Sequence, residues 1–161
     1  MFDVLSWLEA SAIGRLVRDA GPWGYAILNL THVLGVAAMF GSVLVLDLRL
    51  IGLWRRVPIA PLAAAATPVA AAGFTVAAAS GAALLTATAT DYAGNPFLLI
   101  KFPAIAVGLV NVLLLRRLPA WQARGSRELS PRETRQLAVF GGMSLVSWLT
   151  AVAAGRLIAY W

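Results

Sequence analysis

The sequence predicts an all-α fold, an integral membrane bundle of four transmembrane helices with an N-terminal amphipathic interfacial helix. Of the 161 residues, 60% are hydrophobic and only 12% are charged, whereas soluble domains carry about 25% charged residues. The mean hydropathy is +0.80. The apolar residues gather in four segments, each close to the roughly 20 residues that a bilayer requires. Because the polar residues are too few to coat a water-soluble globule, we expect the chain to lie in a lipid bilayer.

The N-terminal stretch, residues 2–20, is predicted to lie on the membrane rather than to cross it. Its apolar residues recur at helical spacing among charged ones, and Trp7 is expected at the level of the lipid headgroups. The following AGPWG, at residues 20–24, contains the glycine and proline of a turn that leads the chain into the bilayer.

A single membrane domain, residues 1–161, is predicted to hold four spans, at about 23–54, 62–90, 97–115 and 137–160. The second span is rich in alanine and contains Gly73 and Gly81, which let neighbouring helices approach closely. Residues 116–136 form the predicted cytoplasmic loop. Within this loop Ser130 is expected to cap a helix whose first residue is Pro131.

The arginine residues predict the orientation of the spans. Four cationic residues lie on the side of the N-terminus, namely Arg15, Arg18, Lys101 and Arg156. Nine lie at the other ends of the spans: Arg49, Arg55, Arg56, Arg116, Arg117, Arg124, Arg127, Arg132 and Arg135. Because cytoplasmic loops carry the excess of Lys and Arg, both termini are expected in the periplasm. We therefore predict a multi-pass protein of the bacterial inner membrane.

The polar residues within the spans gather at the predicted periplasmic level, and they define a candidate cofactor site. Its members are His32, Asn29, Lys101, Arg156 and Tyr160. Ionisable groups inside a bilayer are costly and are by default candidates for function. His32 is the only histidine, and it is the predicted centre of the site and a candidate ligand for haem iron.

Three further polar residues are predicted to be structural. Asp47 and Arg49 lie at the cytoplasmic end of the first span, where we expect them to form a boundary ion pair with nearby arginines. Asn111 is expected to join two helices.

The chain resembles a largely uncharacterised family of small, four-span bacterial inner-membrane proteins. The resemblance rests on HVLGVAAMFGSVLVLDLRLIG, SGAALLTATATDYAGNPFLLIKFPAIAVGLVN and AAGRLIAYW. Its recurring points are His32, Asp47, Arg49, Gly52, Asn95, Pro96, Lys101, Asn111, Gly155 and Arg156. More distantly, the helix count and the early histidine resemble those of four-helix membrane cytochromes b and copper-resistance D-type proteins. Those cytochromes pair two or more histidines on a haem, whereas this chain has one.

Two functions are predicted. In the first, His32 binds a redox cofactor for electron transfer, either b-type haem or a quinone, and Lys101 and Arg156 meet the haem propionates. A haem bound by one chain would be five-coordinate, or it would take a second iron ligand such as Met143 or His32 of another protomer. In the alternative, the chain is a non-catalytic accessory or assembly subunit of a larger membrane complex or a homo-oligomer.

The sequence argues against several other functions. The arginines flank apolar spans, as membrane topology requires, so nucleic acid is not an expected partner. There is no cysteine, which excludes thiolate metal sites and covalent haem attachment. His32 has no carboxylate on its own span nearer than Asp47, and the sequence offers no nucleophile–base–acid set. We therefore expect no enzyme activity from the chain on its own.

Overall fold

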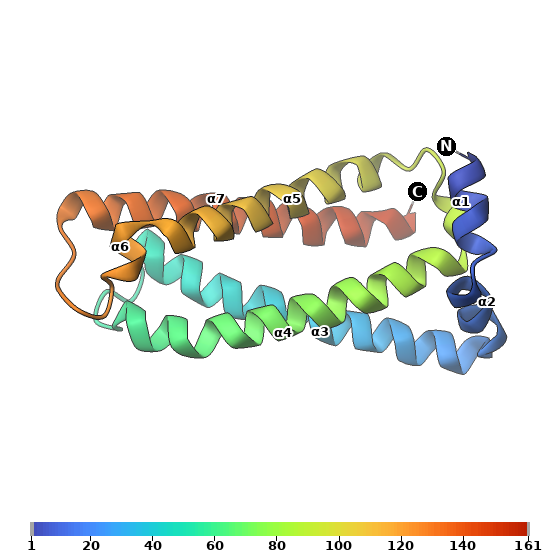
Figure 1. The fold of residues 1–161 in the computed structure, drawn as a ribbon, viewed down its shortest axis with the longest axis horizontal. Coiled ribbons are helices and arrows are strands. Elements are labelled where there is room, and N and C mark those ends of the chain that lie inside the picture. Colours follow the sequence, from blue (N-terminus) through green and yellow to red (C-terminus); the bar gives the residue numbers. More distant parts are fainter. Residues whose placement is uncertain (1, 161) are drawn as a thin grey trace. The chain divides into compact units, whose positions relative to one another are not determined.

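The structure is a computed structural model that describes residues 2–160, and within this range every regular element is a helix. Four helices are long and apolar enough to cross a membrane (Figure 1): α3 (Gly21–Ile51), α4 (Ile59–Ala87), α5 (Pro96–Arg117) and α7 (Pro131–Leu157). The prediction of an all-helical protein with four candidate membrane spans is confirmed. The chain is accordingly a multi-pass membrane protein.

Five shorter helices accompany the four long ones: α1 (Phe2–Glu9), α2 (Ala12–Asp19), η1 (Ala89–Tyr92), α6 (Pro119–Gln122) and η2 (Ile158–Tyr160). The predicted single helix over residues 2–20 is therefore two helices. The break has a local cause, because the side chain of Ser11 accepts a hydrogen bond from the backbone N–H of Gly14 and starts α2. The location of α1 and α2 in the membrane interface stays a prediction.

Local backbone chemistry sets the ends of the long helices. Gly52 has φ +118, and the N–H of Leu53 donates to the carbonyl of Leu48 over 3.0 Å, so α3 ends at Ile51. At the start of α7, the side chains of Ser130 and Glu133 each accept a hydrogen bond from the backbone N–H of the other residue. The predicted cap at Ser130, followed by Pro131, is confirmed.

The contacts between residues divide the chain into two compact units. The first unit comprises Met1–Met39 and Ala71–Pro96. It holds α1, α2, η1 and the facing parts of α3 and α4, which run antiparallel because His32 meets Gly81 while Met39 meets Gly73. The glycines let these two helices approach at backbone distance, as the alanine-rich sequence of α4 predicts.

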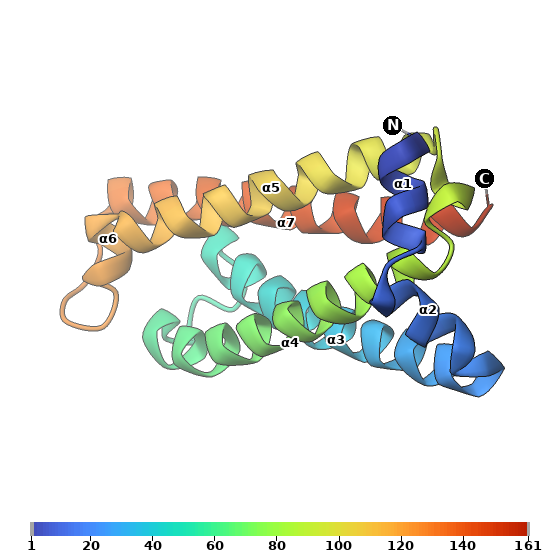
Figure 2. The same ribbon diagram turned by 45° about the vertical axis from the view of Figure 1, so that its right-hand side comes forward.

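The second unit comprises Phe40–Ala70 and Phe97–Trp161. Here α5 and α7 lie side by side (Figure 2) and run antiparallel, because Lys101 meets Gly155 and Gly108 meets Trp148. An apolar core lies at the α6 end of this unit, formed by Leu50, Ala63, Leu115, Ala120, Trp121 and Leu137.

Candidate functional site

His32, the predicted centre of the site, is half-buried in the first unit, where it joins α3 to α4. Its Nδ1 lies 2.9 Å from the carbonyl oxygen of Ala77 and 3.3 Å from Oγ of Ser80. A carbonyl only accepts hydrogen bonds, so Nδ1 carries the proton in this contact. That hydrogen bond fixes both the tautomer and the orientation of the ring.

The imidazole of His32 fits against α4 because residue 81 has no side chain. A Cβ atom at Gly81 would lie 2.7 Å from Cε1 and 3.1 Å from Nδ1 of the ring. One turn further along, a Cβ atom at Gly35 would lie 2.8 Å from the backbone nitrogen of Ala77. The geometry therefore makes His32 part of a tight helix–helix contact, which is a packing role.

The other predicted site residues do not gather around His32 within the first unit. Asn29 belongs to the first unit, but its side chain is exposed. Lys101, Arg156 and Tyr160 belong to the second unit. There, Arg156 donates a hydrogen bond of 2.6 Å to the hydroxyl of Tyr160 and lies over its ring, with the guanidinium carbon 4.8 Å from the ring centroid.

Lys101 lies near this pair along α7. Its Nζ would lie 3.4 Å from a Cβ atom at Gly155, which precedes Arg156 in the chain. The structure thus brings two cationic residues to neighbouring positions of the second unit. Among the described residues, no group of three His, Cys, Asp or Glu side chains gathers closely enough to hold a metal ion.

The second unit also contains a cluster of buried polar side chains that the sequence did not predict. It is formed by Asp47, Asn111 and Ser144, whose exposed fractions are 3%, 2% and 4%. The hydroxyl of Ser144 hydrogen bonds the carboxyl group of Asp47, and Nδ2 of Asn111 donates to the carbonyl of Phe140 over 3.0 Å. Asn111 joins α5 to α7, as expected.

The predicted boundary ion pair at Asp47 is wrong. Within the described residues, no Lys or Arg forms a salt bridge with Asp47. Arg49 instead donates hydrogen bonds to the carbonyls of Val57 and Arg55 in the loop after α3. The reason is geometric, because residues two apart on a helix point in nearly opposite directions.

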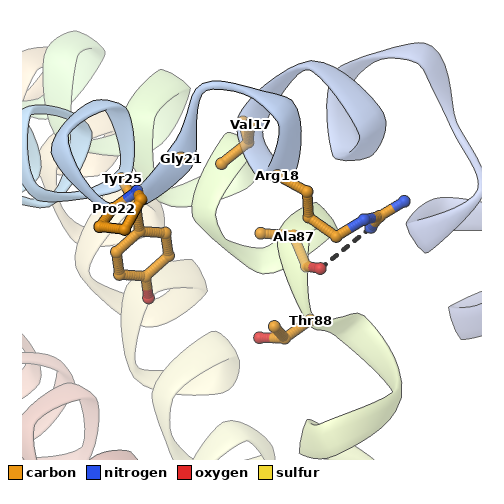
Figure 3. Close-up of a pocket in the computed structure, with 7 residues that line it drawn as sticks. All are labelled: Val17, Arg18, Gly21, Pro22, Tyr25, Ala87 and Thr88. Atoms are coloured by element: carbon orange, nitrogen blue, oxygen red, sulfur yellow. Dashed lines mark hydrogen bonds between the residues drawn. The ribbon is translucent and has the colours of Figure 1, made fainter.

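The two short N-terminal helices lie against the end of α4 and the start of η1. Oε2 of Glu9 accepts hydrogen bonds from the backbone N–H of Thr90, over 3.0 Å, and from its hydroxyl, over 2.7 Å. Arg18 donates to the carbonyl of Ala87 over 3.0 Å. A mainly apolar cavity of about 400 Å³ lies beside this contact (Figure 3), lined by Val17, Arg18, Gly21, Pro22, Tyr25, Ala87 and Thr88.

Comparison with protein families gives a match that covers almost the whole chain. A family model described as "Family of unknown function (DUF6644)" matches residues 4–161. No curated protein and no solved structure matches the chain. The expected similarity to a largely uncharacterised family is therefore found, whereas no similarity to a cytochrome b is shown.

Proposed function

The chain belongs to a family of unknown function, DUF6644, and we propose that it is a non-catalytic subunit that packs against other helices in a membrane complex. The observation that carries this proposal is the outward face of α4 in the first unit. Between residues 71 and 82, Val76 is the only exposed residue with a side chain larger than threonine. The others are Ala71, Ala72, Thr75, Ala78, Ala79 and Ala82.

Small residues three and four positions apart favour a helical partner over lipid. They form one flat strip, against which the backbone of a second helix can pack closely. Thr75 brings no unsatisfied donor to this face, because its hydroxyl donates a hydrogen bond to the carbonyl of Ala71 over 3.0 Å.

The exposed face of α5 provides a comparison within the same chain. Most of its outward side chains are large and apolar, as is usual for positions that face lipid: Leu99, Ile100, Phe102, Val107, Leu109, Val110, Leu113 and Leu114. The difference between α4 and α5 supports a helical partner at α4. His32 and Asn111 each bridge two helices of this chain, a packing role that fits a non-catalytic subunit.

The test is the mass of the protein in a mild detergent, measured by native mass spectrometry. An integer multiple of the 17.0 kDa chain identifies other copies as the partner, and a reproducible additional mass identifies a different subunit. Ala78→Leu adds bulk to the face of α4 and is expected to dissociate the assembly. Ala106→Leu, the same change at an exposed position of α5, is the control and should leave it intact. A wild-type monomer would contradict the proposal.

A redox cofactor at His32 is the second candidate, and the anchored ring supports it. A histidine that binds a metal through one ring nitrogen usually donates a hydrogen bond from the N–H of the other to a carbonyl or carboxylate. Nδ1 of His32 donates to the carbonyl of Ala77 in this way. The cofactor would be b-type haem, bound through Nε2, or a quinone, whose reduced quinol form would donate a hydrogen bond from its hydroxyl to Nε2. The distant likeness to membrane cytochromes b and copper-resistance D-type proteins belongs to this candidate.

Spectroscopy and extraction test the second candidate. Protein purified from its native membrane should show a Soret band or release a quinone into organic solvent, and His32→Ala should abolish either signal. Ser80→Ala, which removes one neighbour of Nδ1 but leaves the contact with Ala77, should retain it. Wild-type protein with neither signal would leave His32 with its packing role alone.

We also propose that the membrane is the bacterial inner membrane and that both termini lie in the periplasm. The support is the excess of arginine at the ends of α3 and α5 and in the segment before α7.

A further inference from the structure

We propose that Asp47, Asn111 and Ser144 bind one monovalent metal cation, Na⁺ in the first instance, inside the second unit. This inference is independent of the proposed packing function. It rests on oxygen atoms that are buried within the fold and on a buried carboxyl group that forms no salt bridge with a basic side chain among the described residues.

The three side chains come from three different helices and meet at one turn of α7. Asp47 of α3 reaches Ser144, and Asn111 of α5 reaches Phe140, four residues earlier on α7. Positions four apart are neighbours on one helix face. A Cβ atom at Gly141 would lie 3.1 Å from the carbonyl oxygen of Asp47, so α3 approaches this turn at backbone distance.

Two oxygens of the cluster lack a hydrogen-bond donor. Oδ2 of Asp47 and Oδ1 of Asn111 are buried and have no hydrogen-bond partner among the described residues. Leaving such acceptors unsatisfied in a low-dielectric interior is costly. A carboxylate, an amide oxygen and a hydroxyl are hard oxygen ligands of the kind that hard metal cations prefer.

The charge of the site selects a monovalent ion. The cluster contains one carboxyl group, and no Lys or Arg in the described part of the chain forms a salt bridge with it. A buried charge is stable only when it is compensated. One Na⁺ neutralises one carboxylate, whereas a divalent ion would leave an uncompensated positive charge.

Two further features favour a cation at this place. Asp47 lies near the C-terminal end of α3, where the partial negative charge of the helix attracts cations. The apolar core that contains Leu50 and Leu137 lies beside the cluster, since Leu50 also contacts Gly141. Water is therefore excluded from one side of the site, which strengthens the attraction between ion and carboxylate.

The experiment measures thermal unfolding of the purified full chain in detergent, with NaCl exchanged for choline chloride at constant ionic strength and pH. At a Na⁺ concentration ten times the Kd, the Tm of the wild type is expected to rise by about 3–6 °C. Asp47→Asn keeps the shape of the side chain and removes its charge, and Ser144→Ala removes one oxygen. Both variants should lose the response, even if their own Tm differs from that of the wild type.

Asp91→Asn is the matched control, because it removes an exposed carboxylate in the first unit and should keep the Na⁺ response. A wild-type Tm that does not change between NaCl and choline chloride overturns the proposal. So does a Tm that rises only when the pH is lowered, because the partner of Asp47 is then a proton. An Asp47→Asn variant that still responds to Na⁺ places the ion elsewhere and also overturns it.

Discussion

The imidazole of His32 lies directly on the backbone of Gly81, so closely that a Cβ atom at residue 81 would come within 2.7 Å of its Cε1 atom. The same two helices meet at Gly73, where a Cβ atom would lie 2.5 Å from the backbone nitrogen of Met39. At these positions α3 and α4 have no spare volume. The stability of the first unit therefore depends on glycine at residues 73 and 81 of α4, where no side chain is present.

Gly81→Ala is expected to destabilise the protein by about 1–3 kcal/mol, because the added methyl group displaces the ring of His32 from Ala77. Thermal unfolding in detergent measures the change. The double variant His32→Ala/Gly81→Ala should recover part of the loss, since the smaller side chain at residue 32 makes room for the new methyl group. An effect of Gly81→Ala that is equally large with and without His32 would contradict the assigned contact.

Gly142→Ala is the control for this substitution, because a Cβ atom at Gly142 meets nothing within 4 Å. There the higher helix propensity of alanine acts alone. We expect the free energy of unfolding to rise by about 0.5–1 kcal/mol.

The membrane spans were predictable because hydropathy is a local property of about 20 residues. The cap at Ser130 was predictable for the same reason, since Ser130, Pro131 and Glu133 are adjacent in sequence. The division of residues 2–20 into two helices was not predicted. The division depends on a single hydrogen bond, which the side chain of Ser11 accepts at the start of α2. A continuous amphipathic helix fits the same hydrophobic spacing, so the spacing does not reveal the break.

The candidate site was less predictable, because it depends on which faces of the helices meet. Sequence places His32 and Asn29 on one stripe of α3, but only the ring of His32 reaches α4. The position of Asp47 at the end of the first span, close to several arginines, favoured an ion pair at the membrane boundary, whereas the partner of Asp47 is Ser144, on another helix. No local pattern identifies such a partner. The small residues Gly141 and Ser144 indicate only that another helix can approach α7 closely there, and they do not identify that helix.

Ser130→Ala is expected to destabilise the start of α7 by about 1 kcal/mol, because the backbone N–H of Glu133 loses the acceptor on the cap side chain. Hydrogen exchange of the amides of residues 132–134 should become faster, while exchange in the middle of α7 stays unchanged. Ser126→Ala is the control. Its exposed hydroxyl donates a hydrogen bond to the carbonyl of Ala123, and Ser126 does not immediately precede a long helix.

Arg127→Cys is expected to react with a membrane-impermeant maleimide from the cytoplasmic side only. The chain has no cysteine of its own, so each variant carries a single label. Asp91→Cys is the control, because α5 separates residue 91 from residue 127 and the two must face opposite sides if α5 crosses the membrane. Labelling of Arg127→Cys in intact cells would reverse the proposed orientation.

The contact between Glu9 and Thr90 should make the docking of α1 dependent on pH. Hydrogen bonds from the hydroxyl and the backbone N–H of Thr90, with a smaller contribution from the charge of Arg18, hold the pKa of Glu9 below its usual 4.5. A carboxyl group whose pKa is lower in the folded state stabilises that state above its unfolded pKa. The stabilisation is lost as the pH falls through the folded pKa.

We therefore expect the docked arrangement of α1 to be fully stabilised at neutral pH and weakened below pH 4.5, the usual pKa of glutamate. The amide resonance of Thr90 in an NMR titration reports this directly, because its N–H donates to the titrating oxygen. Its chemical shift should follow the protonation of Glu9, with a midpoint below 4.5. Glu9→Gln should abolish the titration, whereas Asp19→Asn, at an exposed carboxylate of the same unit, should preserve it. A Thr90 resonance that titrates unchanged in Glu9→Gln would show that another group controls it, because glutamine has no proton to lose in this range.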